Sequence, residues 1–238
     1  KQIHAWGAVD ASSPIDILNP INYYYLFTDA DETKIGRESL AIDFYLQPFK
    51  FGIIFMPNHI TSSIPENDPD FPITLPASPE NYQMLEQKEL DKPIEIGGYF
   101  KASTNNADWM ISYFSGYDRN FNLYGAKVYQ SNLNESITVI DTIFSYRQTD
   151  MVSLSNTSFI GDLTLRADFA YFMTNAGDYN IDNRSYHGQD PIYFQEILEF
   201  SDTAWINREF NFHGSYYQFS VQLEYMLPYN IELTSQIF

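Results

Sequence analysis

Apolar and polar residues alternate along the end of the chain. Between positions 217 and 227 every odd-numbered residue is large and apolar, and the even-numbered residues up to Glu224 are polar. A turn at 228–230 follows, and the alternation resumes over 231–237. Because successive side chains of a strand point to opposite faces, this pattern predicts a hairpin with one apolar and one hydrophilic face.

The same alternation recurs upstream and predicts an all-β chain of about 10–12 strands. The predicted strands cover the end of one strand at 1–9, then 40–48, 49–56, 94–102, 107–117, 123–130, 137–147, 150–160, 163–173, 192–200, 205–213 and the final hairpin.

Short turns at Pro48, Asn105, Gly161 and Pro228 alternate with longer, more polar connections. Outer-membrane barrels have this asymmetry, with short periplasmic turns and long extracellular loops. We therefore expect an antiparallel up-and-down sheet that closes into a transmembrane β-barrel, since closure leaves no free edge.

Two connections are long. Residues 57–93 are rich in proline and acidic side chains, and residues 174–190 form a second polar stretch. Long loops in compact domains are usually functional. We expect the loop at 57–93 to fold inward or to cap the mouth of the barrel.

Aromatic residues are abundant, with 19 Tyr, 19 Phe and 3 Trp making up 17% of the chain. Tyr and Trp suit the membrane–water interface, where one end of the side chain is apolar and the other is wet. The same composition also fits a soluble Tyr-rich β-sandwich that binds carbohydrate. The mean hydropathy of −0.32 and the lack of a run of ~18 apolar residues exclude a transmembrane helix, but a barrel needs only every second residue to be apolar.

The formal net charge is −18, from 31 acidic and 13 basic residues. This balance argues against a nucleic-acid partner, whose phosphates need Lys and Arg. It fits an acidic pore or acidic loops that attract cations, and it also fits simple solubility. The absence of Cys excludes disulfides and thiolate metal sites.

Charged and amide side chains on the hydrophilic faces are candidates for lining a pore, where rows of charge set ion preference. The alternative is a salt-bridged network that fills a closed interior. The candidates are Asp43, Glu95, Lys101, Arg147, Arg166, Asp168, Gln222, Glu224 and Glu232.

No motif predicts catalysis, a metal site or a cofactor. The four His residues are scattered without zinc spacing, and no nucleophile elbow, phosphate loop or dinucleotide fingerprint occurs. We expect no enzyme activity, although a triad assembled in space leaves no local signature.

Several segments resemble porin-like outer-membrane barrels of Gram-negative bacteria, of the uncharacterised or alginate-export-like kind. The resemblance rests on Lys1–Gly7, Asp10, Pro14–Pro20, Leu40–Asn58, Asp108–Arg119 and Tyr225–Gln236, with Asn22 where the family has Asp. It implies a single-chain antiparallel transmembrane barrel with passive transport activity, and it supplies no substrate.

Taken together, we expect one domain over residues 1–238, with strands missing at both ends because the family's barrels are larger. The expected function is a porin of the bacterial outer membrane, passing small polar or cationic solutes. Expected partners are the lipid bilayer or lipopolysaccharide, small solutes, and a second copy or a surface complex. The rivals are the soluble β-sandwich and a barrel that serves as a non-conducting scaffold.

Overall fold

Strands form the regular structure of the chain. A computed structural model describes residues 2–10, 12–25, 33–65, 82–84, 93–130, 138–175, 206–209, 213–228 and 231–238. These ranges contain twelve strands and one short 3₁₀ turn, η1 (Tyr23–Tyr25), so the predicted all-β class is confirmed. No helix within them is long and apolar enough to cross a membrane.

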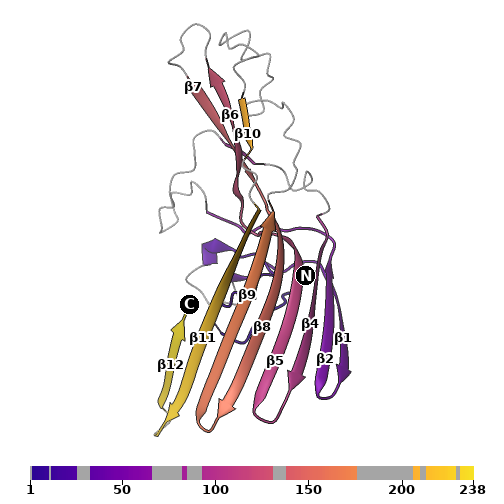
Figure 1. Cartoon of the computed structure of the whole chain (residues 1–238), viewed down its shortest axis with the longest axis vertical. Coiled ribbons are helices and arrows are strands. Elements are labelled where there is room, and N and C mark those ends of the chain that lie inside the picture. The colour runs from indigo at the N-terminus through magenta and orange to yellow at the C-terminus, as the bar shows by residue number, and fades with distance from the viewer. Residues whose placement is uncertain are drawn as a thin grey trace.

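Eight strands form one antiparallel sheet and follow each other across it in chain order (Figure 1). The order is β1-β2-β4-β5-β8-β9-β11-β12, so the predicted up-and-down arrangement is confirmed. The strands are β1 (Leu40–Leu46), β2 (Phe49–Met56), β4 (Glu95–Ser103), β5 (Ala107–Tyr117), β8 (Gln148–Ile160), β9 (Leu163–Asn175), β11 (His213–Leu227) and β12 (Ile231–Ile237).

The other four strands form a second, smaller sheet in the order β10-β6-β7-β3. They are β3 (Tyr82–Met84), β6 (Asn122–Gln130), β7 (Thr138–Ser145) and β10 (Ile206–Glu209). This sheet extends beyond one end of the eight-stranded sheet instead of packing on its face (Figure 1). The sequence predicted β6 and β7 as strands but not their separate sheet, because alternation does not specify which sheet a hairpin joins.

Short turns and long connections lie at opposite ends of the eight-stranded sheet, as predicted (Figure 1). The short turns join β1 to β2, β4 to β5, β8 to β9 and β11 to β12. In the β8–β9 turn Gly161 has φ 61, a left-handed conformation that glycine adopts at little cost. The predicted strand at 192–200, the loop at 176–190 and most of the loop at 57–93 lie outside the described residues.

The eight-stranded sheet is open, which corrects the expectation of a closed barrel. Strand β1 lies at one edge and β12 at the other, and no described pairing joins them. Closure requires a fixed tilt and stagger between the first and last strands. Alternation along a strand shows which residues share a face, but it does not show whether the first strand pairs with the last. The sequence therefore could not establish that the sheet closes.

We call residues 2–25 the N-terminal segment. This segment crosses one face of the sheet instead of forming the strand predicted at 1–9, and its backbone makes only isolated bridges, including Gln2 with Arg37. The amides of Ala8 and Val9 donate to the carboxylate of Asp168 on β9. The carboxylate of Asp168 therefore accepts the hydrogen bonds that a neighbouring strand would otherwise accept from Ala8 and Val9.

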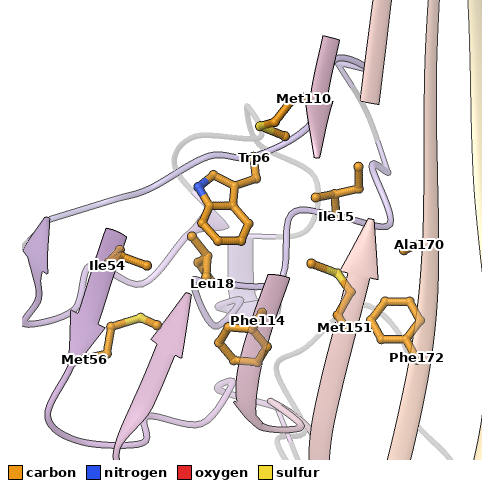
Figure 2. Packing of buried hydrophobic residues seen from close by; sticks show 10 residues of the cluster. All are labelled: Trp6, Ile15, Leu18, Ile54, Met56, Met110, Phe114, Met151, Ala170 and Phe172. Carbon is orange, nitrogen blue, oxygen red and sulfur yellow. The ribbon is translucent and has the colours of Figure 1, made fainter. Parts of the chain in front are cut away.

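The hydrophobic core lies between the N-terminal segment and the sheet. Figure 2 shows Trp6, Ile15 and Leu18 of the segment facing side chains of β2, β5, β8 and β9. The sheet contributes Ile54, Met56, Met110, Phe114, Met151, Ala170 and Phe172. Each fully buried side chain of this size contributes about 1.5–3 kcal/mol, so this contact holds the segment firmly.

The two faces of the sheet differ in what covers them. We call the face under the N-terminal segment the inner face and the opposite one the outer face. On the outer face, each of the eight strands exposes a large apolar side chain, between 41% and 59% accessible. One such residue from each strand, in sheet order, is Phe44, Ile53, Ile96, Ile111, Leu154, Phe169, Phe219 and Leu233.

Candidate functional site: the inner face of the sheet

Most of the predicted pore-lining residues share the inner face. The register places Gln222 opposite Arg166 and Ser220 opposite Asp168, in phase with the buried Ala170. Seven of the candidates lie on this face: Asp43, Glu95, Lys101, Arg166, Asp168, Gln222 and Glu224. For Glu232 the structure describes only the backbone, which pairs with Met226. The alternation of the sequence identified the seven because a strand turns every second side chain to one face.

Arg147 is the exception. It lies in the connection between β7 and β8, and its backbone carbonyl accepts a hydrogen bond from the N–H of Asp118 at 2.9 Å. The sequence placed it inside a strand over 137–147, but β7 ends at Ser145. Arg147 is therefore at the end of the sheet that carries the long connections.

The carboxylate of Asp168 anchors the start of the N-terminal segment. It accepts hydrogen bonds from the N–H of Ala8 at 2.9 and 3.0 Å, from the N–H of Val9 at 3.1 Å and from the hydroxyl of Ser13 at 2.7 Å. The side chain is buried, and these four bonds satisfy both of its oxygens. A buried carboxylate is stable when several N–H donors point at it.

A second polar contact follows next to this anchor. Arg166 on β9 pairs with Asp10 at 2.5 Å and with Glu224 on β11 at 3.3 Å. Gln222 donates to Asp10 at 2.9 Å and to Glu224 at 2.7 Å, and it accepts the N–H of Asp10 at 3.0 Å. Four side chains thus tie the segment to β9 and β11.

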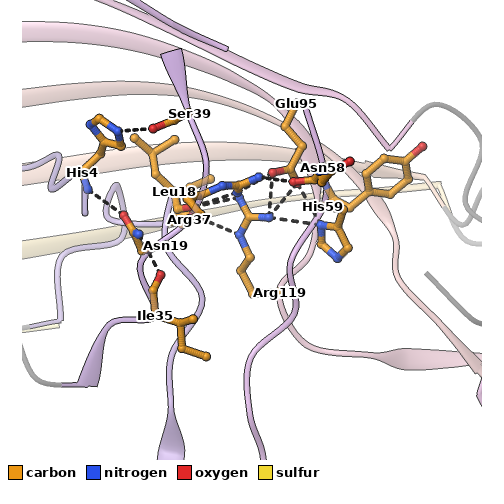
Figure 3. Close-up of polar contacts among 12 residues, drawn as sticks. His4, Leu18, Asn19, Ile35, Arg37, Ser39, Asn58, His59, Glu95 and Arg119 are labelled. Atoms are coloured by element: carbon orange, nitrogen blue, oxygen red, sulfur yellow. Dashed lines mark hydrogen bonds and ion pairs between the residues drawn. The ribbon is translucent and has the colours of Figure 1, made fainter. Parts of the chain in front are cut away.

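A buried ionic cluster fixes the far end of the segment (Figure 3). Glu95, the first residue of β4, binds Arg37 at 2.6 Å and Arg119 at 2.6 and 2.9 Å. It also accepts from His59 at 2.9 Å and from the N–H of Tyr117 at 3.1 Å. Two cations and two further donors therefore surround one carboxylate that is fully buried.

The two arginines of this cluster also hold the backbone of the N-terminal segment. Arg37 donates to the carbonyl of Leu18 at 3.0 Å, and Arg119 donates to the carbonyls of Ile17 at 3.0 Å and Leu18 at 3.1 Å. The guanidinium group presents several donors in a rigid fork, so it can bind a carboxylate and carbonyls together. The cluster joins five separate parts of the chain: the N-terminal segment, Arg37, His59, Glu95 and the stretch from Tyr117 to Arg119.

His59 is neutral in this cluster. Burial is the largest influence on its pKa and lowers it from 6.5, while the contact with Glu95 opposes the shift. Glu95 is already matched by two guanidinium groups, so another positive charge would be uncompensated. The Nδ1 of His59 lies 2.9 Å from Glu95 and 3.1 Å from a guanidinium nitrogen of Arg119, and its ring packs edge-on against Tyr117 and Tyr146. Its buried Nε2 has no hydrogen-bond partner among the described residues.

Asp43 and Lys101 lie on a part of the inner face that the N-terminal segment leaves open to solvent. Asp43 pairs with Lys50 at 2.9 Å and accepts from the hydroxyl of Tyr99 at 2.8 Å. The ammonium group of Lys101 lies 5.4 Å from the centre of the Tyr99 ring. This group of charges can meet solutes directly, in contrast to the buried anchors.

The inner face therefore combines the two arrangements considered from the sequence. Glu95, Arg166, Asp168 and Gln222 are engaged in two separate sets of polar contacts under the N-terminal segment, whereas Asp43 and Lys101 remain accessible. Pore lining by the accessible residues stays a prediction. Within the described residues no group of three or more His, Asp or Glu side chains could hold a metal ion.

Sequence reasoning missed the partners of these residues. Asp10, Arg37, His59 and Arg119 lie in irregular connections, where no periodicity marks a side chain as buried. From the sequence, Arg119 was named only as the last residue of a segment that resembles porin-like barrels, and no contact was assigned to this side chain. Comparison of the chain with known protein families, with characterised proteins and with solved structures finds no match.

Proposed function

We propose that the eight-stranded sheet belongs to a transmembrane β-barrel of a bacterial outer membrane, and that the barrel is a channel for passive diffusion of small polar or cationic solutes. The supporting observation is the apolar outer face. Monomeric soluble proteins rarely expose a contiguous apolar patch larger than a few hundred Å². Here large apolar side chains are exposed on all eight strands.

Lipid is the environment that this face fits best. Strands β5, β8, β9 and β11 have 11 to 15 residues, and about 9–11 tilted residues cross a bilayer. The soluble β-sandwich would bury the apolar face against a second sheet. The smaller sheet extends from the end of the large one, so among the described residues it does not supply that cover (Figure 1).

The proposal requires that the edges at β1 and β12 be paired in the membrane. Unpaired backbone groups in hydrocarbon cost several kcal/mol each, so only closed barrels cross a bilayer with strands. Further strands or another copy of the sheet would supply the pairing. The barrel circumference, measured by electron microscopy, would report the number of strands.

Selectivity for cations follows from the acidic character of the chain. The net charge is −18. On the accessible part of the inner face, Asp43 and Asp108 balance the charges of Lys50 and Lys101, so the expected preference depends on the acidic excess of the whole chain. Carboxylates beside a water-filled path raise the local concentration of cations. Planar bilayers containing the protein should show a reversal potential of cation-selective sign in a KCl gradient.

Variants that remove carboxylates from the inner or from the outer face show which face determines the reversal potential. Asp43→Asn with Asp108→Asn should reduce the cation preference, whereas Asp150→Asn, which removes a charge paired with Tyr113 on the outer face, should leave it unchanged. A clear preference for anions would contradict the proposal.

The N-terminal segment favours a second candidate, a barrel that serves as a scaffold without conducting. The segment covers much of the inner face and is held there by Asp168 and by the Glu95 cluster. Protein that inserts in bilayers but stays silent, in the wild type and in an Asp168→Ala variant, would support the scaffold over the channel.

A further inference from the structure

A cavity of about 340 Å³ lies between the N-terminal segment and the inner face. Its floor comes from β5, β8, β9 and β11, close to where the long connections leave the sheet, and one wall comes from residues between Asp16 and Tyr23. Sites for small molecules range from about 300 to 1,000 Å³. The volume therefore fits one small ligand.

Aromatic rings supply much of the lining. Phe172 on β9 and Tyr216 on β11 stack with their ring centres 4.8 Å apart and their planes at 19°. Tyr23 and Tyr117 line the same space from the segment and from the end of β5. Ring faces carry partial negative charge that attracts cations, and their apolar surface also packs against apolar groups.

The charge in the cavity is negative where a ligand can reach it. Asp118 lines it, with one oxygen accepting from Thr149 at 2.6 Å and the other from Asn122 at 3.0 Å. Burial raises the pKa of Asp118, against smaller opposing effects of its hydrogen bonds and of Arg147. A carboxylate that has lost part of its water gains more from a nearby cation.

Among the described residues that line the cavity, the one cation is Arg119, and it is already engaged. Its guanidinium group binds Glu95 and the carbonyls of Ile17 and Leu18. Most of its N–H donors are therefore already used and are not available to an anion in the cavity. The other charged lining residue, Asp16, is paired with Lys34.

From this combination we propose that the cavity is a binding site for a small organic cation, an ammonium group on a compact apolar or hydroxylated body. The rings hold the cationic head, and the carboxylate of Asp118 compensates its charge. Among the described lining residues, an anion would meet the carboxylate of Asp118 and a guanidinium group, that of Arg119, whose donors already bind Glu95 and two carbonyls. If the sheet forms the proposed channel, a cation bound in this cavity would lie against the inner face, beside the path of the solutes. This role in transport rests on the proposed function, whereas the binding itself does not.

The test uses the full chain in detergent micelles and two probes of similar shape, choline and its uncharged analogue 3,3-dimethylbutan-1-ol. Ligand-observed NMR titrations at low ionic strength measure both dissociation constants. Choline should bind at least about tenfold more tightly than the alcohol, a difference of about 1.4 kcal/mol. Asp118→Asn should remove this advantage, because it removes the charge and keeps one oxygen for Thr149, at the cost of the hydrogen bond from Asn122.

Two further variants complete the test. Tyr216→Leu removes one ring of the stacked pair and should weaken both probes, whereas Asp162→Asn in the β8–β9 turn should change neither. Equal binding of the two probes, no binding of choline, or choline binding that Asp118→Asn leaves unchanged would each overturn the site. Since binding is measured without a bilayer, a silent channel would contradict the proposed function and leave this result standing.

Discussion

The carboxylate of Asp168 accepts hydrogen bonds from the backbone N–H of Ala8 with both of its oxygens, although 160 positions separate the two residues. Ala8 begins a stretch that would otherwise need a strand partner, and Asp168 lies in the middle of β9. A side chain of the sheet, Asp168, thus accepts the backbone hydrogen bonds of a segment that crosses the inner face. The position of the N-terminal segment can therefore be tested by substituting one side chain, Asp168.

Replacing Asp168 should release the start of the segment. Asp168→Ala leaves the half-buried N–H of Ala8 and the buried N–H of Val9 without acceptors, which should cost about 3 kcal/mol of unfolding free energy. Hydrogen exchange at residues 8–13 should accelerate by more than tenfold. Asp162→Ala in the β8–β9 turn is the control, and equal exchange in both variants would show that the anchor is unimportant.

The buried and exposed ion pairs should differ sharply in cost. Glu95→Gln leaves Arg37 and Arg119 without their shared counter-charge, and removing one partner of a buried pair costs about 3–5 kcal/mol. Asp43→Asn breaks the solvent-exposed pair with Lys50 and should cost about 0–1 kcal/mol. Denaturant unfolding in micelles measures both; similar losses would mean that the Glu95 cluster is open to water.

Stability should fall as the pH drops below about 6.5. Burial lowers the pKa of His59 below the 6.5 of an exposed imidazole, so the unfolded chain binds the proton more readily. The stabilisation is complete above 6.5 and is lost as the pH falls toward the folded-state pKa. Glu95 faces the ring and favours its protonation, while Arg37 and Arg119 oppose it.

The measurement for this prediction is the unfolding midpoint at pH 7.5 and pH 5.5. His59→Asn should lose less stability between the two than the wild type does. His4 is a second group whose pKa burial lowers, so His4→Asn is examined in parallel to separate its share. A pH dependence that survives both substitutions would assign the effect to other groups.

Gly7 is the position where a small substitution should disturb the anchor most. It has φ +108, and an added Cβ would lie 2.2 Å from the hydroxyl of Ser13 and 2.7 Å from a carboxylate oxygen of Asp168. Gly7→Ala should therefore cost more than about 1 kcal/mol and speed proteolysis of the N-terminal segment. Gly161→Asn, at φ +61 in open space, should change stability by less than about 0.5 kcal/mol.

The sequence predicted most strands of the large sheet and the face of each side chain, because both follow from local alternation. In the strand predicted at 163–173, alternation puts Phe169 and Tyr171 on one apolar face, and both lie on the exposed outer face. Alternation could not show that Phe114 and Phe172, on the other face, form a core with Trp6. That core depends on a distant segment with no periodic pattern.

The candidate site was predictable only in part for the same reason. Asp168 and Glu95 were identified as members of a polar face, but their partners Ala8 and Arg37 are brought to them by the path of irregular connections. The pattern predicted that these carboxylates point inward. It did not predict what they bind.

The outer face of the sheet must contact lipid if the chain forms a membrane channel, and one measurement tests this contact directly. The chain contains no Cys, so single cysteines carrying nitroxide labels can be placed along β8 in reconstituted bilayers. Labels at Val152 and Leu154 should collide readily with dissolved oxygen and rarely with a water-soluble nickel complex, whereas labels at Ser153 and Ser155 should be shielded from oxygen. Strong collisions with the nickel complex at 152 and 154, or shielding from both reagents there, would contradict a lipid-facing sheet.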